Sequence, residues 1–294
     1  MKIAVMGAGA VGSYFGARLH QAGHEVVLIA RPATVEAIRL LGLRLQMKDF
    51  DGRLPLAAST DPAVAATADL VLFCVKSQDT ETAGASLKDV LRRHCTVLCL
   101  QNGVDNAQRL SQVLGFPAVP AAVYVAVEMP APGHVVHNGR GEMVIGPSPG
   151  SEKAARAFAQ AGIPVQVTPT VMHALWAKLA ANCAWNALSA LTQLPYGDLV
   201  QRPGIEETLR GIVAECRTVA AAEGFSLPAT LWDDIHDLSR SMSGQRSSTA
   251  QDLARGRRTE IDYINGFVMR RAAAHGIDVP LNRLLHALVK IKEG

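Results

Sequence analysis

The segment KIAVMGAGAVGSYFGARLHQAG, residues 2–23, joins an apolar run, a glycine-rich turn and a helix-like stretch without interruption. The run at 2–6 does not alternate with polar residues, which is typical of a strand buried on both faces. The turn fits G-x-G-x-x-G, whose glycines allow a tight bend, close approach to a pyrophosphate, and packing of the helix on the strand. The helix directs its free amides and positive dipole end at the same place. The motif predicts a dinucleotide site, with a purely structural turn as the alternative; its residues are Gly7, Ala8, Gly9, Ala10, Val11 and Gly12.

Three similar apolar runs follow, EVVLIA from residue 25, LVLFCV from 70 and TVLCL from 96. Helix-like stretches lie between the runs, and SLKDVLRRH at 86–94 is one of them. Strands that alternate with helices favour an α/β fold with a parallel sheet. We therefore expect a Rossmann-type, doubly wound, mainly parallel sheet in the N-terminal part of the chain.

The pattern changes after about residue 117, where AAVYVAVEM, GHVVHNG and EMVIG predict three short strands with no helix between them. Such strands predict antiparallel pairing at one edge of the sheet. After TPT at 168–170 the strand signals largely disappear, and helical patterns continue to residue 294. A chain of this length commonly forms two domains. We expect an NADP(H)-binding Rossmann domain at 1–168 and an all-helical substrate domain at 169–294.

Composition narrows the class of protein. The formal net charge is only +3 and no dense Lys/Arg run is present, which gives little support to nucleic-acid binding. Five cysteines without a C-x-x-C pair, in apolar contexts, indicate buried free thiols in a reducing compartment. Neither the cysteines nor the nine histidines have metal-ligand spacing. No apolar stretch could cross a bilayer and no secretory signal is recognisable, so we expect a cytoplasmic enzyme or binding protein without a metal or a membrane partner.

The end of the second strand indicates which dinucleotide is bound. An NAD site usually has an acidic residue there, about twenty residues after the glycines, that bonds the ribose hydroxyls. Here the stretch LIARP carries Arg31, and a guanidinium matches a phosphate far better than a hydroxyl. Arg31 therefore predicts NADPH rather than NADH. The alternative is a surface arginine whose stem covers the adjacent helix.

Two further strand ends point at the same crevice, because ligands of open parallel sheets gather at the carboxyl ends of strands. Lys76 follows one strand in CVKSQD, and Asn102 follows the next in LQNGVDN. Lys76 is predicted to meet cofactor or substrate anions, and Asn102 to bridge the nicotinamide region and the substrate. A solvated loop lysine and an Asn-Gly turn are the alternatives.

A polar stripe interrupts the helical segment ALWAKLAANCAWNAL at 174–188. Lys178, Asn182 and Asn186 are spaced four apart and therefore lie on one side of the helix. One interpretation is a solvent-facing side; the other is a cleft wall that presents an ammonium and two amides to a small polar ligand.

Taken together, these blocks resemble the ketopantoate reductases, also called 2-dehydropantoate 2-reductases, over nearly the whole chain. The resemblance rests on GAGAVGS, ARP, VKSQ, LQNGV, LWAKLAANCAWNALSAL and the stretch SSTAQDLARGRRTEIDYINGFVMRRAAAHGIDVP from Ser247 to Pro280. The last two blocks are much more specific than the glycine motif.

The resemblance implies an NADPH-dependent reduction of the 2-oxo group of ketopantoate to (R)-pantoate, a step toward pantothenate and coenzyme A. It implies that Lys178 is the proton donor, that Asn182 and Asn186 hold the substrate, that Ser248 meets its carboxylate, and that Glu260 lies at the junction of substrate and cofactor. The polar stripe would then be the substrate wall of a cleft between the two domains.

The chemistry also follows from the residue types. Hydride arriving at a ketone carbon leaves negative charge on the oxygen, so a nearby cation with a transferable proton lowers the barrier. Lys178 can supply both, and Glu260 is its candidate partner. In TEIDYINGF we expect Glu260 to share a helix side with Ile264 and Phe267, which would set it among apolar neighbours.

Some residues keep a second interpretation. Ser248 and Gln251 form S-x-x-Q, so Ser248 is also a candidate helix cap. Tyr196 stands where many relatives carry Asn, and a phenol bordering the pocket would alter the substrate. Trp176 and Trp185 are expected to pack the helix rather than touch substrate.

Two other functions stay open at this stage. One is a reductase of another branched 2-oxo or 3-hydroxy acid; the other is a non-catalytic NADPH sensor that signals through the helical domain. The sensor leaves the stripe at Lys178 unexplained. A homodimer through the helical domain is compatible with its apolar sides, although packing within one copy would also bury them.

Overall fold

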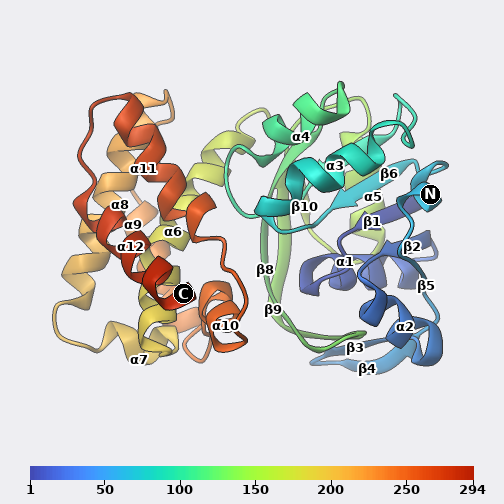
Figure 1. Ribbon diagram of the computed structural model, residues 1–294, viewed down its shortest axis with the longest axis horizontal. Helices are drawn as coiled ribbons and strands as arrows, with labels where there is room; N and C mark the ends of the chain where they lie inside the picture. The colour runs from blue at the N-terminus through green and yellow to red at the C-terminus, as the bar shows by residue number, and fades with distance from the viewer. The chain divides into compact units, whose positions relative to one another are not determined.

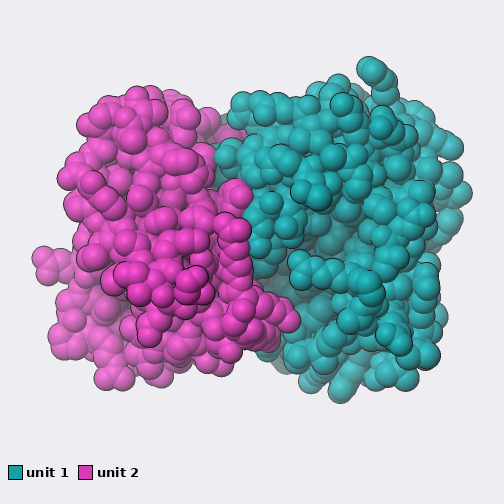
Figure 2. Space-filling view, in the orientation of Figure 1, with its two compact units in different colours: residues 1–171 teal, residues 172–294 magenta.

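The computed structural model describes residues 1–294, which divide into two units, Met1–Val171 and Met172–Gly294 (Figure 2). The division lies three residues beyond the boundary expected from the sequence. Each unit is described by itself. No helix in the chain is both long enough and apolar enough to span a membrane.

The first unit is built on a mixed ten-stranded sheet with the strand order β4-β3-β9-β8-β7-β6-β1-β2-β5, and β10 pairs with β9 (Figure 1). Strands β1, β2, β5, β6, β7 and the start of β8 are parallel to their neighbours. The pairs β8–β9 and β3–β4 are antiparallel. The strands are β1 Lys2–Met6, β2 Glu25–Ile29, β3 Leu43–Met47, β4 Phe50–Leu54, β5 Ala57–Ser59, β6 Leu70–Phe73, β7 Thr96–Cys99, β8 Val119–Ala131, β9 His134–Ile145 and β10 Val165–Val167.

Helices cover both faces of the parallel part of this sheet. In β1, Ile3 and Val5 enter the core that includes residues of α1 and α5, whereas Ala4 and Met6 enter the core that includes residues of α3 and α4. Burial on both faces explains why this strand is a continuous apolar run. The helices of the unit are α1 Ala10–Gln21, α2 Pro32–Leu41, α3 Thr80–Lys88, α4 Asn106–Leu114 and α5 Ser151–Gln160, with short 3-10 turns η1 Pro62–Ala65 and η2 Ser77–Asp79.

The predicted fold class is confirmed, including antiparallel pairing of the strands after residue 117, which is that of β8 with β9. Two details of the prediction are wrong. The two candidates GHVVHNG and EMVIG are one strand, β9, because irregular pairing with β8 accommodates the glycine-rich stretch that separates them. Within that stretch Arg140 has a left-handed backbone, with φ of 60°. The helix expected at 86–94 ends at Lys88. The antiparallel pair at the end of the sheet is β3–β4, which the sequence did not indicate.

The second unit contains helices only, as expected. The long helix α6 carries Trp176 and Trp185, both about 1% exposed. The Trp185 indole N–H donates to the carbonyl of Ile235 at 3.0 Å, and the Trp176 ring lies 5.6 Å from that of Phe267. Both tryptophans therefore pack α6, as predicted. The elements are α6 Val171–Thr192, α7 Tyr196–Val200, α8 Ile205–Ala222, α9 Leu231–Ser241, α10 Ser248–Ala254, η3 Ile261–Tyr263, α11 Asn265–Ala274 and α12 Pro280–Glu293.

All five cysteines are free thiols, and all but Cys74 are buried. Burial raises the pKa of Cys95 to about 11 and that of Cys99 to about 12. Burial also raises the pKa of Cys183 well above its usual value. The thiols of Cys95, Cys99 and Cys183 are therefore protonated and unreactive at neutral pH.

Candidate functional site

The glycine turn follows β1 directly and is held by backbone bonds to the end of β2. The amides of Gly7 and Ala8 both donate to the carbonyl of Ile29 at 3.0 Å. Gly7 has φ of +97°, and a Cβ there would lie 2.7 Å from the amide nitrogen of Val75. A Cβ on Gly12 would lie 2.4 Å from the carbonyl oxygen of Gly7. The turn and the packing of α1 therefore require glycine at both positions.

Gly9 has a different environment. A Cβ on Gly9 would have no heavy atom within 4 Å, and the backbone there is extended. Gly9 is the N-cap of α1, and no side chain caps the amides of this helix start. The open space beside Gly9 and the amides beyond it fit a pyrophosphate, which needs both close backbone approach and N–H donors. The predicted residues Ala8, Ala10 and Val11 belong to this turn and to the first turn of α1.

Arg31 lies two residues beyond β2, where it precedes the first residue of α2. Its side chain is 88% exposed, so it does not pack its stem on the helix. One guanidinium nitrogen lies 3.7 Å from a carboxylate oxygen of Asp79. An exposed guanidinium at the end of β2 fits the 2′-phosphate of NADPH.

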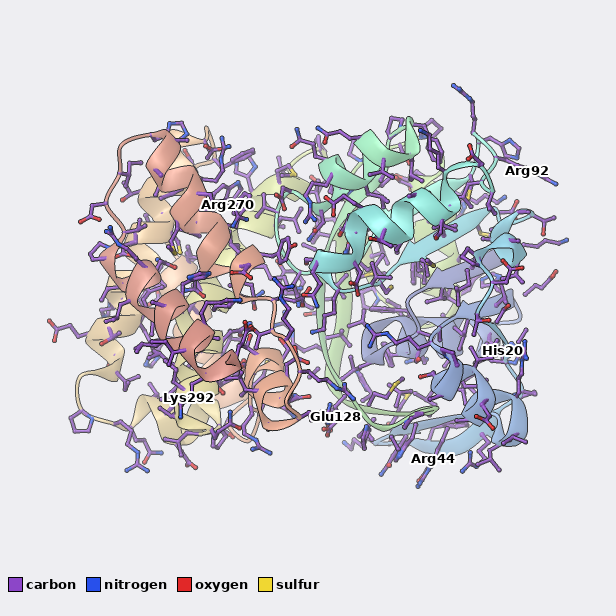
Figure 3. The ribbon with its side chains drawn as sticks, viewed as in Figure 1. His20, Arg44, Arg92, Glu128, Arg270 and Lys292 are labelled. Carbon is purple, nitrogen blue, oxygen red and sulfur yellow. The ribbon has the colours of Figure 1, made fainter.

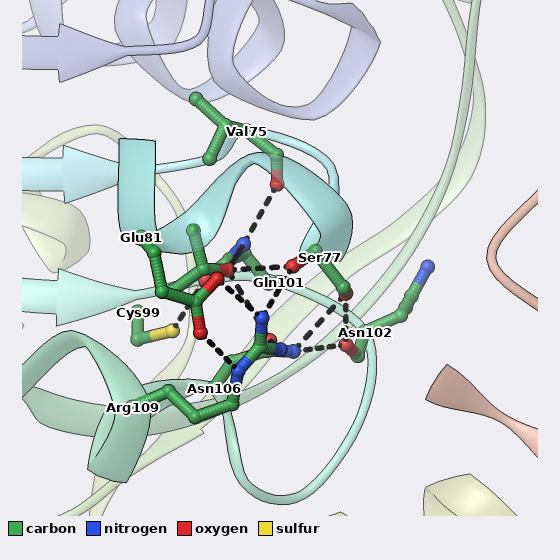
Figure 4. Close-up of polar contacts among 9 residues, drawn as sticks. Val75, Ser77, Glu81, Cys99, Gln101, Asn102, Asn106 and Arg109 are labelled. Atoms are coloured by element: carbon green, nitrogen blue, oxygen red, sulfur yellow. Dashed lines mark hydrogen bonds and ion pairs between the residues drawn. The ribbon is translucent and has the colours of Figure 1, made fainter. Parts of the chain in front are cut away.

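Lys76 and Asn102 follow β6 and β7, which are adjacent parallel strands, so both residues lie at the carboxyl edge of the sheet. Both are half-buried. A buried polar network ties their two loops together (Figure 4). Ser77 Oγ donates to the Asn102 carbonyl at 3.0 Å, and Asn106 Nδ2 donates to Ser77 Oγ at 3.1 Å and to the same carbonyl.

Gln101 and Arg109 extend this network to the neighbouring elements. Gln101 Nε2 donates to the Val75 carbonyl at 3.0 Å and to Thr80 Oγ1 at 2.8 Å. Arg109 donates to Asn106 Oδ1 at 2.9 Å and pairs with both carboxylate oxygens of Glu81 at 2.7 Å. The loops that carry Lys76 and Asn102 are therefore rigidly held relative to each other. Sequence reasoning missed these supporting residues, because most of these bonds join residues 21 to 29 positions apart and leave no local pattern.

In the second unit, the polar stripe of α6 is not exposed. Lys178 and Asn182 are half-buried, and Asn186 is only 3% exposed. A solvent-facing side would leave these groups mostly accessible, so the environment favours the interpretation of a recessed wall. A half-buried ammonium next to two amides can donate a proton and bind a hydroxy acid.

Ser248 lies at the start of α10 and is exposed. The predicted capping role is wrong: the cap is Ser247, whose Oγ accepts from the Ala250 amide at 3.0 Å. Ser247 Oγ also donates to the carbonyl of Asn186 at 3.1 Å. This bond fixes the start of α10 against the stripe, and it leaves the Ser248 hydroxyl without a capping task.

Glu260 is 5% exposed and precedes the short turn η3. The prediction that it shares a helix side with Ile264 and Phe267 is wrong. The backbone of Ile264, with φ of −109° and ψ of −97°, breaks the helix between η3 and α11. Phe267 packs on Trp176 of α6 instead.

Helix α12 holds the segment around Glu260 through two carboxylates. Glu293 Oε1 accepts from the Thr259 amide at 2.8 Å and also from the Thr259 hydroxyl. Asp262 lies 2.7 Å from His286 Nε2 and 3.2 Å from Lys290 Nζ. Glu260 lies between the two tethered residues, so α12 sets the position of its backbone. No sequence signal identified this support.

Tyr196 is buried in the core of the second unit. It opens α7, is 8% exposed, and its ring lies 5.0 Å from that of Trp185. Burial raises the pKa of its phenol well above the ordinary value, so the hydroxyl stays neutral. Because Trp185 is the residue before Asn186, Tyr196 can affect the stripe through packing.

The predicted residues fall into two sets, one in each unit. The first unit brings together the glycine turn, Arg31, Lys76 and Asn102 at one edge of the sheet. The second unit carries Lys178, Asn182 and Asn186 on α6, Ser248 at the start of α10 and Glu260 just before η3.

Comparison with known proteins gives one consistent family. The family model described as "Ketopantoate reductase PanE/ApbA" matches residues 3–150, and the corresponding C-terminal model matches residues 170–293. The 2-dehydropantoate 2-reductase of Halobacterium salinarum is 36% identical over 100% of this chain and 99% of its own length. That of Vibrio cholerae is 33% identical over 100% of this chain and 98% of its own length.

Solved structures agree on the fold. A PanE/ApbA family ketopantoate reductase from Ralstonia eutropha JMP134 is 54% identical, with a TM-score of 0.96 over 100% of this chain and 98% of its own. A D-mandelate dehydrogenase in a ternary structure with NADH and anilino(oxo)acetate is 26% identical. Its TM-score is 0.95, over 100% of this chain and 98% of its own.

Proposed function

Because the chain belongs to the ketopantoate reductase family, we propose that it catalyses the NADPH-dependent reduction of 2-dehydropantoate to (R)-pantoate, in pantothenate and coenzyme A biosynthesis. The family is one of NADP-dependent oxidoreductases that act on CH–OH groups. The observation that carries the proposal is the stripe of half-buried Lys178 and Asn182 and buried Asn186. The family models match the chain in both units.

The first unit, residues 1–168 in the proposed division, would bind the cofactor. Bound NADPH supplies the hydride. The amides beyond Gly9 bind the pyrophosphate, and Arg31 binds the 2′-phosphate. Lys76 and Asn102, held together by the network beneath them, contact the cofactor near the substrate. The open space at Gly9 and the exposed guanidinium of Arg31 fit this assignment.

The helical unit, residues 169–294, would bind the keto acid and supply the proton. Lys178 Nζ donates its proton to the substrate oxygen as hydride reaches the carbon, which neutralises the developing alkoxide. Asn182 and Asn186 bind the polar groups of the substrate, and Ser248 binds its carboxylate. Glu260 orients the ammonium and contacts the cofactor.

The direct test is NADPH absorbance decay when 2-dehydropantoate is added to the purified protein. Steady oxidation of NADPH with formation of pantoate supports the proposal. Tight NADPH binding without turnover of any 2-oxo acid would reject it in favour of a non-catalytic sensor.

A second candidate is a reductase of another branched 2-oxo acid with the same mechanism. Two observations support a different substrate. The fold is similar to that of a D-mandelate dehydrogenase. The bulky Tyr196 packs on Trp185, the residue before Asn186 of the stripe. The test is steady-state kinetics over a panel of 2-oxo acids that includes an aryl one. A preference of more than a hundredfold in kcat/KM for another acid, equal to about 2.7 kcal/mol of transition-state free energy, would reject 2-dehydropantoate as substrate.

The homodimer through the helical unit and the cytoplasmic location remain part of this proposal. Three exposed apolar residues of α12 support the homodimer, namely Leu284, Leu288 and Ile291. Sedimentation of the wild type and of Leu288→Glu tests it, because a charge in the interface should shift a dimer to monomer. The five free thiols support a reducing compartment.

A further inference from the structure

Asp79 is an acidic residue that pairs with the arginine assigned to the 2′-phosphate. Its carboxylate lies 3.7 Å from the Arg31 guanidinium, although Asp79 follows β6 and Arg31 follows β2. The two strands flank β1 on opposite sides, so the pair spans the carboxyl edge of the sheet beside the glycine turn. No local sequence pattern links the two residues.

The carboxylate of Asp79 does not cap the helix that follows it. Asp79 is the N-cap of α3, where an aspartate normally accepts a bond from a backbone amide of the helix. Here the side chain makes no capping bond. It is 44% exposed and faces Arg31 instead.

This placement bears on cofactor choice. A 2′-phosphate adds about two negative charges at the position that Arg31 serves, and it must compete with the Asp79 carboxylate for the guanidinium. A free ribose hydroxyl carries no charge and does not compete with the Asp79 carboxylate for the guanidinium. We propose that Asp79 is a specificity-determining residue that weakens the preference for NADPH over NADH by competing for Arg31. The inference rests on the proposed function, because it assumes that Arg31 serves the cofactor.

The experiment measures dissociation constants of NADPH and NADH with the full-length protein, by isothermal titration calorimetry at low ionic strength. In Asp79→Asn the dissociation constant for NADPH should fall about three- to tenfold, while that for NADH stays within twofold. Exposed pairs of this kind are worth up to about a fivefold change, and removal of repulsion with the phosphate adds to it. Asp79→Ser, which is also neutral, should give the same change.

A matched control is Asp89→Asn, which removes the same charge from the other end of α3. Asp89 is an exposed residue at the C-cap, about 15 Å further along the chain at 1.5 Å per residue. It should leave the NADPH to NADH ratio within twofold. Raising the salt concentration should shrink the effect of Asp79→Asn, because both charges are exposed.

A double variant tests the route through Arg31. In an Arg31→Ala background, Asp79→Asn should change the ratio less than it does in the wild type, because only the direct repulsion between the carboxylate and the phosphate is then relieved. An unchanged ratio in the single variant, an equal change for both dinucleotides, or an equal effect of Asp89→Asn would overturn the inference. If the wild type binds neither dinucleotide, the proposed function itself fails; if it binds NADPH but the ratio ignores Asp79, only this inference fails.

Discussion

Two glycines of one motif are required for different reasons. Gly12 must be glycine for α1 to pack, since a Cβ there would overlap the carbonyl of Gly7 at 2.4 Å. Gly9 has open space and an ordinary backbone, so the protein without ligand does not require it. What requires glycine at position 9 is a ligand that approaches the backbone.

We expect Gly9→Ala to fold with a free energy of unfolding within about 0.5 kcal/mol of the wild type, as for a substitution that disturbs no contact. The same variant should bind NADPH at least tenfold more weakly, because its methyl group occupies the space for the pyrophosphate. Gly12→Ala should be strongly destabilised instead. Urea unfolding and calorimetric titration separate the two effects, and normal NADPH binding by Gly9→Ala would contradict this position of the pyrophosphate.

Lys178→Ala should lower kcat by about a hundredfold or more, since it removes the proposed general acid. NADPH binding should persist, because the residues proposed to bind its pyrophosphate and 2′-phosphate lie in the other unit. Lys292→Ala is a matched control: Lys292 is exposed near the end of α12 (Figure 3) and should be dispensable. Steady-state kinetics measures kcat, and a binding titration measures the affinity for NADPH. A near-normal kcat in Lys178→Ala would show that Lys178 is not the proton donor.

Arg31→Ala should raise KM for NADPH and erode its advantage over NADH, because the charge that attracts the 2′-phosphate is lost. The measurement is the ratio of kcat/KM for the two cofactors. An unchanged ratio would show that the end of β2 does not set cofactor preference.

At the scale of elements, the network between β6 and β7 supports the two loops that carry Lys76 and Asn102. Asn106 is 2% exposed and bonds four different residues in it, namely Ser77, Thr80, Asn102 and Arg109. We expect Asn106→Ala to lose about 1–3 kcal/mol of unfolding free energy, because buried partners are left unsatisfied. KM for NADPH should rise as the loops lose their fixed spacing. Asn138→Ala, at an exposed bond to Glu128, is the control.

Asp262 makes the contact between α12 and η3 sensitive to acid. Burial raises the pKa of its carboxyl, but the hydrogen bonds from His286 and Lys290 outweigh burial and lower the pKa below its usual value. A lowered folded-state pKa adds stability above about pH 4, the unfolded value, and this stability is lost as the pH falls further. Asp262→Asn should therefore cost about 1 kcal/mol near pH 7 and flatten the loss of stability below pH 4.

Urea unfolding as a function of pH measures this effect. Asp278→Asn, which removes an exposed carboxylate from its pair with Arg283, should change stability much less. Equal pH profiles for the wild type and Asp262→Asn would contradict the role given to this contact.

Local sequence patterns predicted the elements whose pattern of apolar residues is uniform from end to end. Strand β1 is a continuous apolar run and α1 follows its glycines, so both were found from sequence. Strand β9 was divided in two, because glycines at 139 and 141 suggested a turn where the structure has a bulged strand. The tether between Thr259 and Glu293 joins residues 34 positions apart, and only the folded chain brings them together.

At the scale of the whole molecule, binding of the cofactor should raise the thermal stability of the protein. A ligand that binds only the folded state adds about 2.7 kcal/mol at one hundred times its dissociation constant. NADPH at that excess should raise the midpoint of thermal unfolding measurably. The same concentration should stabilise Arg31→Ala less, and inorganic phosphate should give little change. No shift with NADPH would contradict dinucleotide binding by this chain.

The rate at which the buried thiols are alkylated reports how often the structure around them opens. Cys95 and Cys99 belong to the sheet unit, Cys183 and Cys216 belong to the helical one, and all four are buried. An alkylating reagent can reach a given thiol only while the surrounding structure is transiently open. The alkylation rate of each cysteine-containing peptide, measured by mass spectrometry, would therefore report the opening of the two units separately, with no engineered label.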